Sequence, residues 1–417
     1  MSVELGVIAD DLTGACDVAA GVHALGVEAE VRLGVPDAKA RPRGRVVIVA
    51  LKSRTAPAAE AVRDSVESAR ALRAWGADRL YLKYCSTFDS TDEGNIGPVA
   101  DALLDLLGED AASAGTPATP AAARTMHRGH LFVGDRLLSE SSLAHHPLTP
   151  MRDPDIVRVL ARQTRRPVAG IPLETLHAGP APVARRLAEL RAQGVRHVLF
   201  DAVEGDDLDV AAAAVAGLDD LLLTGAAGLA TALARPLATE APDRPPPPEG
   251  AGLILSGSGS ERTRAQVAAY RGPAHRIHVP ALVSDAAAVV ADAVGFIGRA
   301  GDRPLITATA EPEEVERLQA RWGRDRTAAL VEDALARIAV AAVEEAGVRR
   351  VLVAGGETSG AVAAALGVAV LRVRRVAAPG VAWTTVTDRA GRALDLCLKS
   401  GNFGGTDFFD DAWEERG

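Results

Sequence analysis

Cysteine is scarce in this chain of 417 residues, which has three, at positions 16, 85 and 397. They lie far apart and form no Cys-x-x-Cys pair, so we expect neither a disulfide scaffold nor a structural zinc site. We expect the protein to reside in the reducing cytoplasm. Long hydrophobic runs are also missing, since the longest apolar stretches have the length of strands or of Ala-rich helix faces. We therefore expect no membrane span, and the N-terminal residues do not resemble a signal peptide.

Basic residues are fewer than acidic residues. The chain has 46 Lys and Arg against 55 Asp and Glu, a formal net charge of −9. This excess of acid argues against nucleic acid as a partner, because phosphate backbones require a basic face. It is compatible with small anionic substrates, which need only a local basic pocket. The hydrophobic content of 48% excludes a disordered chain, and the length of 417 residues predicts two or three folded domains. The oligomeric state stays open, a homo-oligomer included.

Lysine and asparagine are both rare. The lysines are Lys39, Lys52, Lys83 and Lys399, and the asparagines are Asn95 and Asn402. Lysine is a compact point charge whereas arginine is a planar fork, so a lysine in an Arg-rich chain suggests a position that arginine cannot serve. Lys83 lies near Asn95, and Lys399 lies near Asn402. We expect chemistry in these two segments, the alternative being that these rare residues persist on the surface by chance.

A proline-rich segment divides the chain. Residues 238–252 contain four consecutive prolines flanked by charge, which is typical of an extended linker. The sequence thus predicts a domain over 1–237, a linker over 238–250 and a domain over 251–417. Strand-like runs (4–9, 45–51, 197–200, 252–256, 304–309 and 349–355) alternate with helical patterns (58–75, 182–193, 261–270 and 327–346). Residues 109–123 are rich in Ala, Pro and Ser and predict a loop or weak strand.

Strands that alternate with helices predict an α/β fold. We expect two domains, each with a mainly parallel sheet flanked by helices, and an active site in the cleft between them. Ligands of such sheets bind at the carboxyl ends of the strands. The residues that follow each predicted strand are therefore the candidates for function.

Two adjacent acids, Asp10 and Asp11, follow the first predicted strand and precede Thr13 and Gly14. They are suited to bind Mg²⁺ or to accept a proton from a hydroxyl, which makes both of them candidate catalytic residues. The alternative is a helix cap, for which one Asp would suffice. After the next strand, Arg54 offers a planar fork that suits a carboxylate or phosphate, although a solvated loop is equally compatible with that segment.

Short polar side chains are dense between residues 82 and 105. The candidate substrate-binding residues here are Lys83, Ser86, Thr87, Asp89 and Asn95. Such a run can line a site for a polyhydroxy acid, whose carboxylate would bind Lys83 or Arg54. The alternative is an ordinary turn, in which these residue types are common. Cys85 has no evident histidine base, so we interpret it as a packing residue.

Four histidines lie at positions 127, 130, 145 and 146. Their spacing matches no common metal-binding pattern. We interpret the segment as a polar lid or pocket wall. The sequence does not identify which residues would bind a metal ion.

Three glycine-rich turns follow predicted strands of the C-terminal half, at 255–260, 355–360 and 399–405. Glycines let backbone N–H groups approach an anion, and helix N-termini add a favourable dipole. None of the three turns is a dinucleotide-binding fingerprint or a Walker A loop. Together with Lys399 they predict a cradle for nucleotide phosphates. The candidate residues are Ser256, Ser258, Gly356, Glu357, Thr358, Ser359, Lys399 and Gly401.

These segments, in order and over nearly the whole chain, resemble the four-carbon acid sugar kinase family. The motifs are IADDLTGACD, LKSRT, KYCSTFDSTDEGNIGP, GHLFVGDRLLSESSLAHHPLTPMRDPD, SGSGS, GGETSG and KSGNFGGTDFF. KYCSTFDST and HPLTPM most resemble the 3-oxo-tetronate kinase subgroup. Around Arg124 and Thr125 the chain departs from the family, where relatives carry a Gly-Arg-Thr turn.

The resemblance implies ATP-dependent phosphorylation of the terminal hydroxyl of a 3-oxo-tetronate, giving the 4-phosphate. It also implies an N-terminal acid-sugar-binding domain and a C-terminal nucleotide-binding domain. ATP would be held by Ser258, Gly356, Glu357, Thr358, Ser359 and Gly401. Mg²⁺ prefers few carboxylates with phosphates and water, which Asp10 or Asp11 could supply. Three alternatives stay open: a threonate or erythronate kinase, a dehydrogenase, and a non-catalytic sugar-acid-binding protein.

Overall fold

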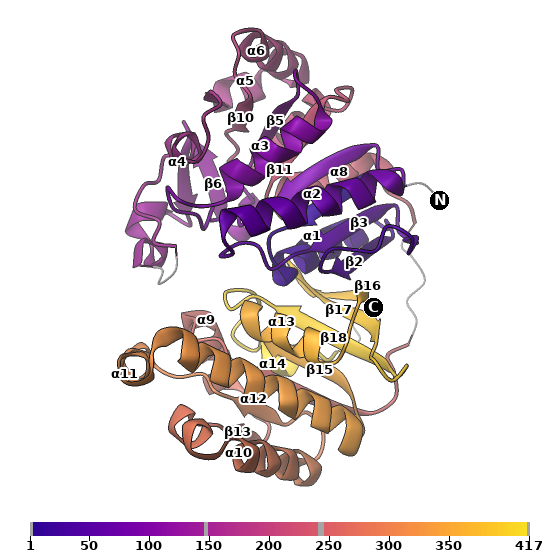
Figure 1. Ribbon diagram of the computed structural model, residues 1–417, viewed down its shortest axis with the longest axis vertical. Helices are drawn as coiled ribbons and strands as arrows, with labels where there is room; N and C mark the ends of the chain where they lie inside the picture. Colours follow the sequence, from indigo (N-terminus) through magenta and orange to yellow (C-terminus); the bar gives the residue numbers. More distant parts are fainter. Residues whose placement is uncertain (1–2, 146–148, 241–245, 415–417) are drawn as a thin grey trace. The chain divides into compact units, whose positions relative to one another are not determined.

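The computed structural model describes residues 3–145, 149–240 and 246–414, with the side chain of residue 145 excepted (Figure 1). It divides into two compact units, Met1–Pro242 and Asp243–Gly417. The division falls inside residues 238–250, the segment that the sequence predicts as a linker. Residues 241–245 of that segment lie outside the described residues.

The first unit is a parallel sheet with helices packed against it. Its strands run in the order β2-β3-β1-β4-β11-β5-β10-β9. Their bounds are β1 Leu5–Ala9, β2 Ala29–Leu33, β3 Val46–Ala50, β4 Arg79–Lys83, β5 Ala112–Thr116, β9 Val168–Ile171, β10 His197–Phe200 and β11 Leu221–Gly225. The helices are α1 Leu12–Ala24, α2 Ala58–Ala74, α3 Ile96–Leu107, α4 Ile156–Gln163, α5 Leu173–His177, α6 Pro180–Ala192, α7 Gly205–Ala214 and α8 Ala227–Ala234.

A small antiparallel sheet belongs to the same unit. It consists of β6 Arg124–His127, β7 His130–Val133 and β8 Arg136–Leu137. The carboxylate of Asp201, just past β10, accepts the backbone N–H groups of Arg128 at 2.5 Å and Gly129 at 2.9 Å. This buried carboxylate ties the β6–β7 turn to the end of the main sheet.

Strand β5 lies within residues 109–123, for which the sequence predicts a loop or weak strand, and it is a central strand of the sheet. All five of its residues are buried, and it pairs with β11 on one side and β10 on the other. A Cβ at Gly115 would overlap the carbonyl oxygen of Thr224. The small side chains are the reason why the sequence predicts a loop or weak strand here. They are also what allows β5 to pack at the centre of the sheet.

The second unit has a mixed sheet in the order β13-β14-β12-β15-β18-β17-β16. The strands are β12 Ala251–Ser256, β13 Ala274–Arg276, β14 Leu305–Thr307, β15 Val348–Ala354, β16 Val370–Ala378, β17 Val381–Thr387 and β18 Ala393–Lys399. The helices are α9 Glu261–Ala269, α10 Val279–Ala300, α11 Pro312–Trp322, α12 Arg324–Glu345, α13 Gly356–Ala365 and α14 Phe408–Asp411. The mainly parallel α/β architecture is confirmed, whereas the antiparallel β16–β17–β18 meander was not predicted.

Within the described residues, α10 is the one helix long and apolar enough to cross a membrane, and 22% of its apolar window is buried. The backbone of Asp285 interrupts it with non-helical angles, and the Asp285 carboxylate accepts the N–H of Ala288 at 3.0 Å. Asp285 thus caps a second helix over 286–300, which at 1.5 Å per residue is about 22 Å long. That is shorter than the roughly 30 Å of a bilayer core. α10 packs against α12 (Figure 1).

Candidate active site

Strands β3, β1 and β4 are neighbours in the first unit, and their carboxyl ends carry the predicted polar residues. Asp10 follows β1, Arg54 follows β3 and Lys83 ends β4. The backbone holds these ends in register, because Asp10 donates its N–H to the Lys83 carbonyl at 3.1 Å and accepts the N–H of Arg54 at 3.2 Å. The structure therefore brings the predicted residues of three separate segments to one edge of the sheet.

Arg54 binds both of the adjacent acids. Its guanidinium donates to the two carboxylate oxygens of Asp10 at 2.8 and 2.9 Å, and to Asp11 at 2.7 Å. Asp11 also caps α1 by accepting the N–H of Gly14 at 3.0 Å. Burial would raise the pKa of Asp11, but the charges of Arg54 and Lys83 outweigh it and lower the pKa to about 2. The cap interpretation thus holds for Asp11 and coexists with an ion-pair network.

Lys83 is 3% exposed, and its ammonium donates to the carbonyl of Tyr84 at 3.0 Å. A Cβ at Gly14 would overlap both Nζ of Lys83 and the Asp11 carboxylate. The ammonium therefore lies against the first turn of α1. Lys83 thus lies at the predicted edge of the sheet. One of the three N–H donors of its ammonium is already bound to the carbonyl of Tyr84.

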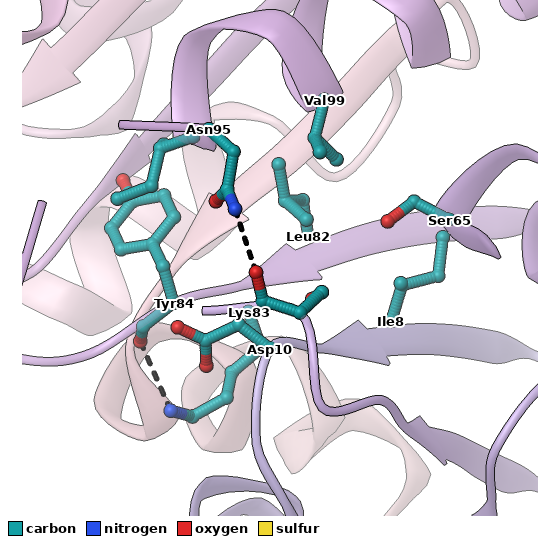
Figure 2. Close-up of a pocket in the computed structure, with 10 residues that line it drawn as sticks. Ile8, Asp10, Ser65, Leu82, Lys83, Tyr84, Asn95 and Val99 are labelled. Atoms are coloured by element: carbon teal, nitrogen blue, oxygen red, sulfur yellow. Dashed lines mark hydrogen bonds between the residues drawn. The ribbon is translucent and has the colours of Figure 1, made fainter. Parts of the chain in front are cut away.

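Asn95 positions the loop that carries Arg54. Its amide donates to the carbonyls of Ser53 at 2.6 Å and Ala56 at 3.1 Å. Figure 2 shows the Asn95 amide and the Lys83 ammonium each bound to a main-chain carbonyl at the margin of a small cavity. The cavity measures about 10 Å³, the space of a single water. A sugar acid does not fit there, so in this arrangement Asn95 acts by holding the Arg54 loop.

The remaining predicted lining follows β4 directly. Ser86 is partly exposed, and Thr87 donates to Asp89 at 2.7 Å. The Cys85 sulfur lies 3.0 Å from the Thr87 hydroxyl, and burial together with the Asp89 charge raises the pKa of the thiol to about 12. Such a thiol is a poor nucleophile, which agrees with the interpretation of Cys85 as a packing residue.

Sequence reasoning missed Asp17, and it named Arg124 only as part of a segment that departs from the family. Asp17 is partly exposed on α1, one turn beyond Gly14, and burial raises its pKa to about 6. The charges of Lys83 and Arg124 oppose this rise. Arg124 begins β6, and its Nε atom is buried with no hydrogen-bond partner among the described residues. The available signal was helical spacing, because Gly14 and Asp17 are three residues apart and so share one face of the helix.

The histidines of the predicted lid are only partly described. His127 is exposed, and His130 lies 2.9 Å through its Nδ1 from the carbonyl of Arg128. Residue 146 and the side chain of residue 145 lie outside the described residues. The lid interpretation stays a prediction.

A Ser–His–Asp chain occurs elsewhere in the unit, among Ser113, His197 and Asp101. Each of its two links, to Nδ1 and Nε2 of His197, measures 2.8 Å. Ser113 is 3% exposed and His197 is fully buried. Because the imidazole that would act as the base is fully buried, we interpret the chain as a structural link among β5, β10 and α3 and not as a hydrolase triad.

In the second unit the three glycine-rich turns meet at one sheet edge, because β12, β15 and β18 are parallel neighbours. Gly257 donates its N–H to Ala354 at 3.1 Å, and Gly355 donates to Lys399 at 2.9 Å. A Cβ at Gly401 would come into contact with the hydroxyls of Ser258 and Ser260. The predicted convergence of the turns is therefore present in the structure.

The serines and threonines of these turns differ in accessibility. Ser256 is fully buried and lies 2.7 Å from the Thr309 hydroxyl, so its role here is to hold the turn. Ser258 is partly exposed, and Gly356 and Glu357 are exposed at the start of α13. Thr358 and Ser359 are buried behind them, and the Ser359 hydroxyl has no hydrogen-bond partner in the described residues. The N-terminus of α13 has no side-chain cap, an arrangement in which helix N–H groups suit an anion.

Lys399 lies beneath the third turn and is fully buried. Its ammonium is 3.3 Å from both the Thr263 hydroxyl and the Gly401 carbonyl. Burial lowers its pKa to about 7, and the Arg262 charge lowers it further while Cys397 opposes the shift. Three donors, from Ser260, Thr263 and Lys399, thus converge on one carbonyl of the glycine-rich turn.

Comparison with known proteins gives one domain match in each unit. Models of a sugar-binding N-terminal domain and a nucleotide-binding C-terminal domain match residues 5–233 and 253–409. Proteins named 3-oxo-tetronate kinase from Cupriavidus necator and Burkholderia multivorans are each 46% identical to this chain, covering 99% and 98% of it and 97% and 96% of their own lengths.

Two solved structures share the fold. One from Salmonella typhimurium LT2 has a TM-score of 0.87 and 35% identity, over 99% of each chain. One from Haemophilus influenzae has a TM-score of 0.77 and 36% identity, over 98% of each chain. Since the two domain models match most of the chain and the named relatives align along nearly all of it, the chain belongs to the four-carbon acid sugar kinase family.

Proposed function

We propose that this chain is a 3-oxo-tetronate kinase, which transfers the γ-phosphoryl group of ATP to the 4-hydroxyl of 3-oxo-tetronate and releases ADP. The observation that carries the proposal is a pair of sheet edges. One gathers Asp10, Arg54 and Lys83, and the other gathers three glycine-rich turns over a buried lysine. The substrate is proposed from the name shared by relatives with up to 46% identity.

The edge with Asp10, Arg54 and Lys83 suits a small polyhydroxy acid. A buried ammonium and a guanidinium offer donors for the carboxylate, while Asp89, Thr87 and Ser86 offer partners for hydroxyls. We propose the cation role for Lys83 or Arg54, as the sequence predicts. Arg54 already donates to the carboxylates of Asp10 and Asp11, whereas the hydrogen bond of Lys83 goes to a neutral carbonyl, so the charge of Lys83 is the less neutralised of the two.

The glycine-rich edge suits the phosphates of ATP. Gly356 is exposed and Ser258 and Gly401 are partly exposed, so their polar groups are available to phosphates, whereas the Ser359 hydroxyl is fully buried behind them. Phosphoryl transfer depends mainly on positioning and on neutralising phosphate charge, which the α13 N-terminus and Lys399 would supply. Transfer requires that acceptor and donor meet. For this reason we keep, as a proposal, the predicted site in a cleft between the domains.

Mg²⁺ is proposed as the companion of ATP. Among the described residues, no group of three or more His, Cys, Asp or Glu side chains could hold a metal ion. Asp10 and Asp11 do not fit as ligands in this arrangement, because Arg54 binds both carboxylates. We therefore propose that phosphate oxygens and water hold the ion, where it would neutralise phosphate charge.

An ADP-release assay tests the function. Purified protein with MgATP is offered 3-oxo-tetronates of both configurations, threonate, erythronate and 2-oxo analogues, and the product is identified by phosphorus NMR. We expect the highest kcat/KM with a 3-oxo-tetronate and a phosphomonoester on carbon 4. Preference for threonate or erythronate would assign the neighbouring activity. Thermal stabilisation by an acid without ADP release would assign a non-catalytic binder. We also propose a cytoplasmic location, which the sequence predicts from its three widely spaced cysteines.

A further inference from the structure

We propose that Asp17 is the general base that accepts the proton of the sugar-acid hydroxyl, a role for which the sequence favours Asp10 or Asp11. The inference rests on the proposed kinase function. It follows from the different surroundings of the three carboxylates, all of which lie at one edge of the first unit.

Asp10 and Asp11 are already occupied. Arg54 donates to both oxygens of Asp10 and to one oxygen of Asp11. The other Asp11 oxygen accepts the Thr13 hydroxyl at 2.6 Å. A carboxylate bound in this way has to give up a charge-assisted bond before it takes a proton, which makes it a poor base. The low pKa of Asp11, about 2, agrees.

Asp17 is placed differently. Within the described part of the chain its carboxylate has no hydrogen-bond or ion-pair partner, and it is partly exposed on α1. Gly14, one turn earlier on the same face, lies against the ammonium of Lys83. A substrate that binds Lys83 would therefore lie over the face of α1 that carries Asp17.

The charged groups around Asp17 come from three elements. They are Asp11 at the start of α1, Lys83 from β4 and Arg124 from β6. Helix α8, which packs against α1, has the sequence AGLATALA and offers no titratable side chain. Strand β2 also packs against α1, but its Glu30 and Arg32 pair with each other at 2.7 Å.

These surroundings suit proton transfer near neutral pH. Burial raises the pKa of Asp17 to about 6, and the Asp11 charge adds to the rise. The ideal general base has a pKa near the working pH, so that it is ionised yet still holds a proton. Two acids whose pKa values are driven apart, such as Asp11 and Asp17, commonly divide the roles of electrostatic anchor and base.

The transfer step balances without a further reactant. The substrate hydroxyl oxygen forms a bond to the γ-phosphorus of ATP, and the bond from that phosphorus to the bridging oxygen breaks. The electron pair of the broken bond leaves with ADP. The hydroxyl proton passes to the Asp17 carboxylate, which later returns it to solvent.

Asp17→Asn tests the proposal. We expect kcat with the preferred acid to fall by about 10²–10⁴-fold, with the Kd for ATP and the KM for the acid changed less than about threefold. Asp64→Asn is the matched control, because Asp64 is a helical carboxylate in the same unit whose partner is the neighbouring Arg63. It should retain wild-type turnover. A near-normal kcat in Asp17→Asn would overturn the proposal.

The pH profile separates a base from a merely structural residue. With the wild type under saturating MgATP and acid, kcat should rise with pH through about 6, because the ionised carboxylate is the active form. The residual activity of Asp17→Asn should lack this rise, and the same acidic limb in the variant would contradict the proposal. If the variant does not fold, a wild-type profile that is flat between pH 5 and 7 overturns it. Wild-type protein inactive with every acid would instead refute the kinase function.

Discussion

The ammonium of Lys83 lies against the backbone of Gly14, so closely that a Cβ at Gly14 would overlap Nζ. Gly14 belongs to the first turn of α1, and its N–H is bound by the carboxylate of Asp11. The absence of a side chain at position 14 is therefore what lets a lysine from β4 reach the charged face of this helix. The contact couples the strand end and the helix cap.

Gly14→Ala should disturb this contact. The added methyl group forces Lys83 and Asp11 to move, and overpacking of this kind costs about 1–3 kcal/mol. We expect kcat/KM for the sugar acid to fall about 10- to 100-fold, with the Kd for ATP unchanged. Gly205→Ala is the matched control, because Gly205 also lies in the first turn of a helix of this unit and an added Cβ there would meet nothing within 4 Å. Equal activity of the two variants would show that the contact is unimportant.

Lys83→Ala should weaken binding of the sugar acid. A charge-assisted contact contributes about 1.5–3 kcal/mol, so KM should rise about 10- to 150-fold. Lys83→Arg should restore little of this, because a planar guanidinium does not reproduce a point charge against the Gly14 backbone. The measurements are KM for the acid beside Kd for ATP. An unchanged KM in Lys83→Ala would leave Arg54 as the candidate cation for the substrate carboxylate.

Much of this arrangement could be predicted from the sequence. Strands of Val, Ile and Leu that end in polar residues predicted where Asp10, Arg54 and Lys83 would meet, because parallel strands share one carboxyl edge. The glycine-rich turns were located for the same reason. In contrast, Asp17 lies inside a helix and follows no predicted strand, and its charged neighbours Lys83 and Arg124 come from distant segments. Pair distances of that kind depend on tertiary packing, which local patterns do not encode.

Strand β5 shows the same limit. Its Ala, Ser and Gly residues have low strand propensity, and the sequence therefore predicts a loop or weak strand. The backbone of Thr224 approaches Gly115 so closely that only small residues fit. Tertiary packing thus overrides local propensity at the centre of the sheet. The antiparallel β16–β17 pair escaped prediction in a similar way, because arginines interrupt its apolar pattern.

His197→Ala should destabilise the first unit. The change removes the partner of Ser113 and one partner of Asp101, leaving a buried hydroxyl and a partly buried carboxylate. A buried polar group without its partner costs about 1–3 kcal/mol, so we expect a loss of about 2–4 kcal/mol in urea unfolding. The exposed His127→Ala should change stability little. Labelling of Ser113 by a fluorophosphonate would contradict the structural role of this chain.

Gln266→Met should weaken ATP binding selectively. The buried Gln266 amide donates to the carbonyls of Phe403 at 3.0 Å and Gly405 at 2.8 Å, which fixes the third glycine-rich turn. Methionine has a similar volume but no donor, so the turn should loosen. We expect KM for ATP to rise about 5- to 30-fold while KM for the sugar acid stays within twofold. Equal effects on both constants would indicate a general loss of folding.

Lys399→Met should change how stability depends on pH. Burial lowers the pKa of Lys399 from 10.5 to about 7, so between these values the unfolded chain binds a proton that the folded chain does not. Stability contributed by this site therefore rises with pH from about 7 to 10. Below pH 7 both states are protonated, and the full cost of burying the charge is present.

The variant has no ammonium to bury, so its advantage in unfolding free energy over the wild type should be largest below pH 7. It should shrink by up to about 4 kcal/mol as the pH approaches 10, as urea unfolding at pH 6.5, 8 and 9.5 would measure. Bound phosphates favour the charged ammonium, and ATP binding at pH 8 should therefore take up close to one proton. Calorimetry in buffers of different ionisation enthalpy measures this uptake. If Lys399→Met takes up the same number of protons as the wild type, the phosphates do not act on this lysine.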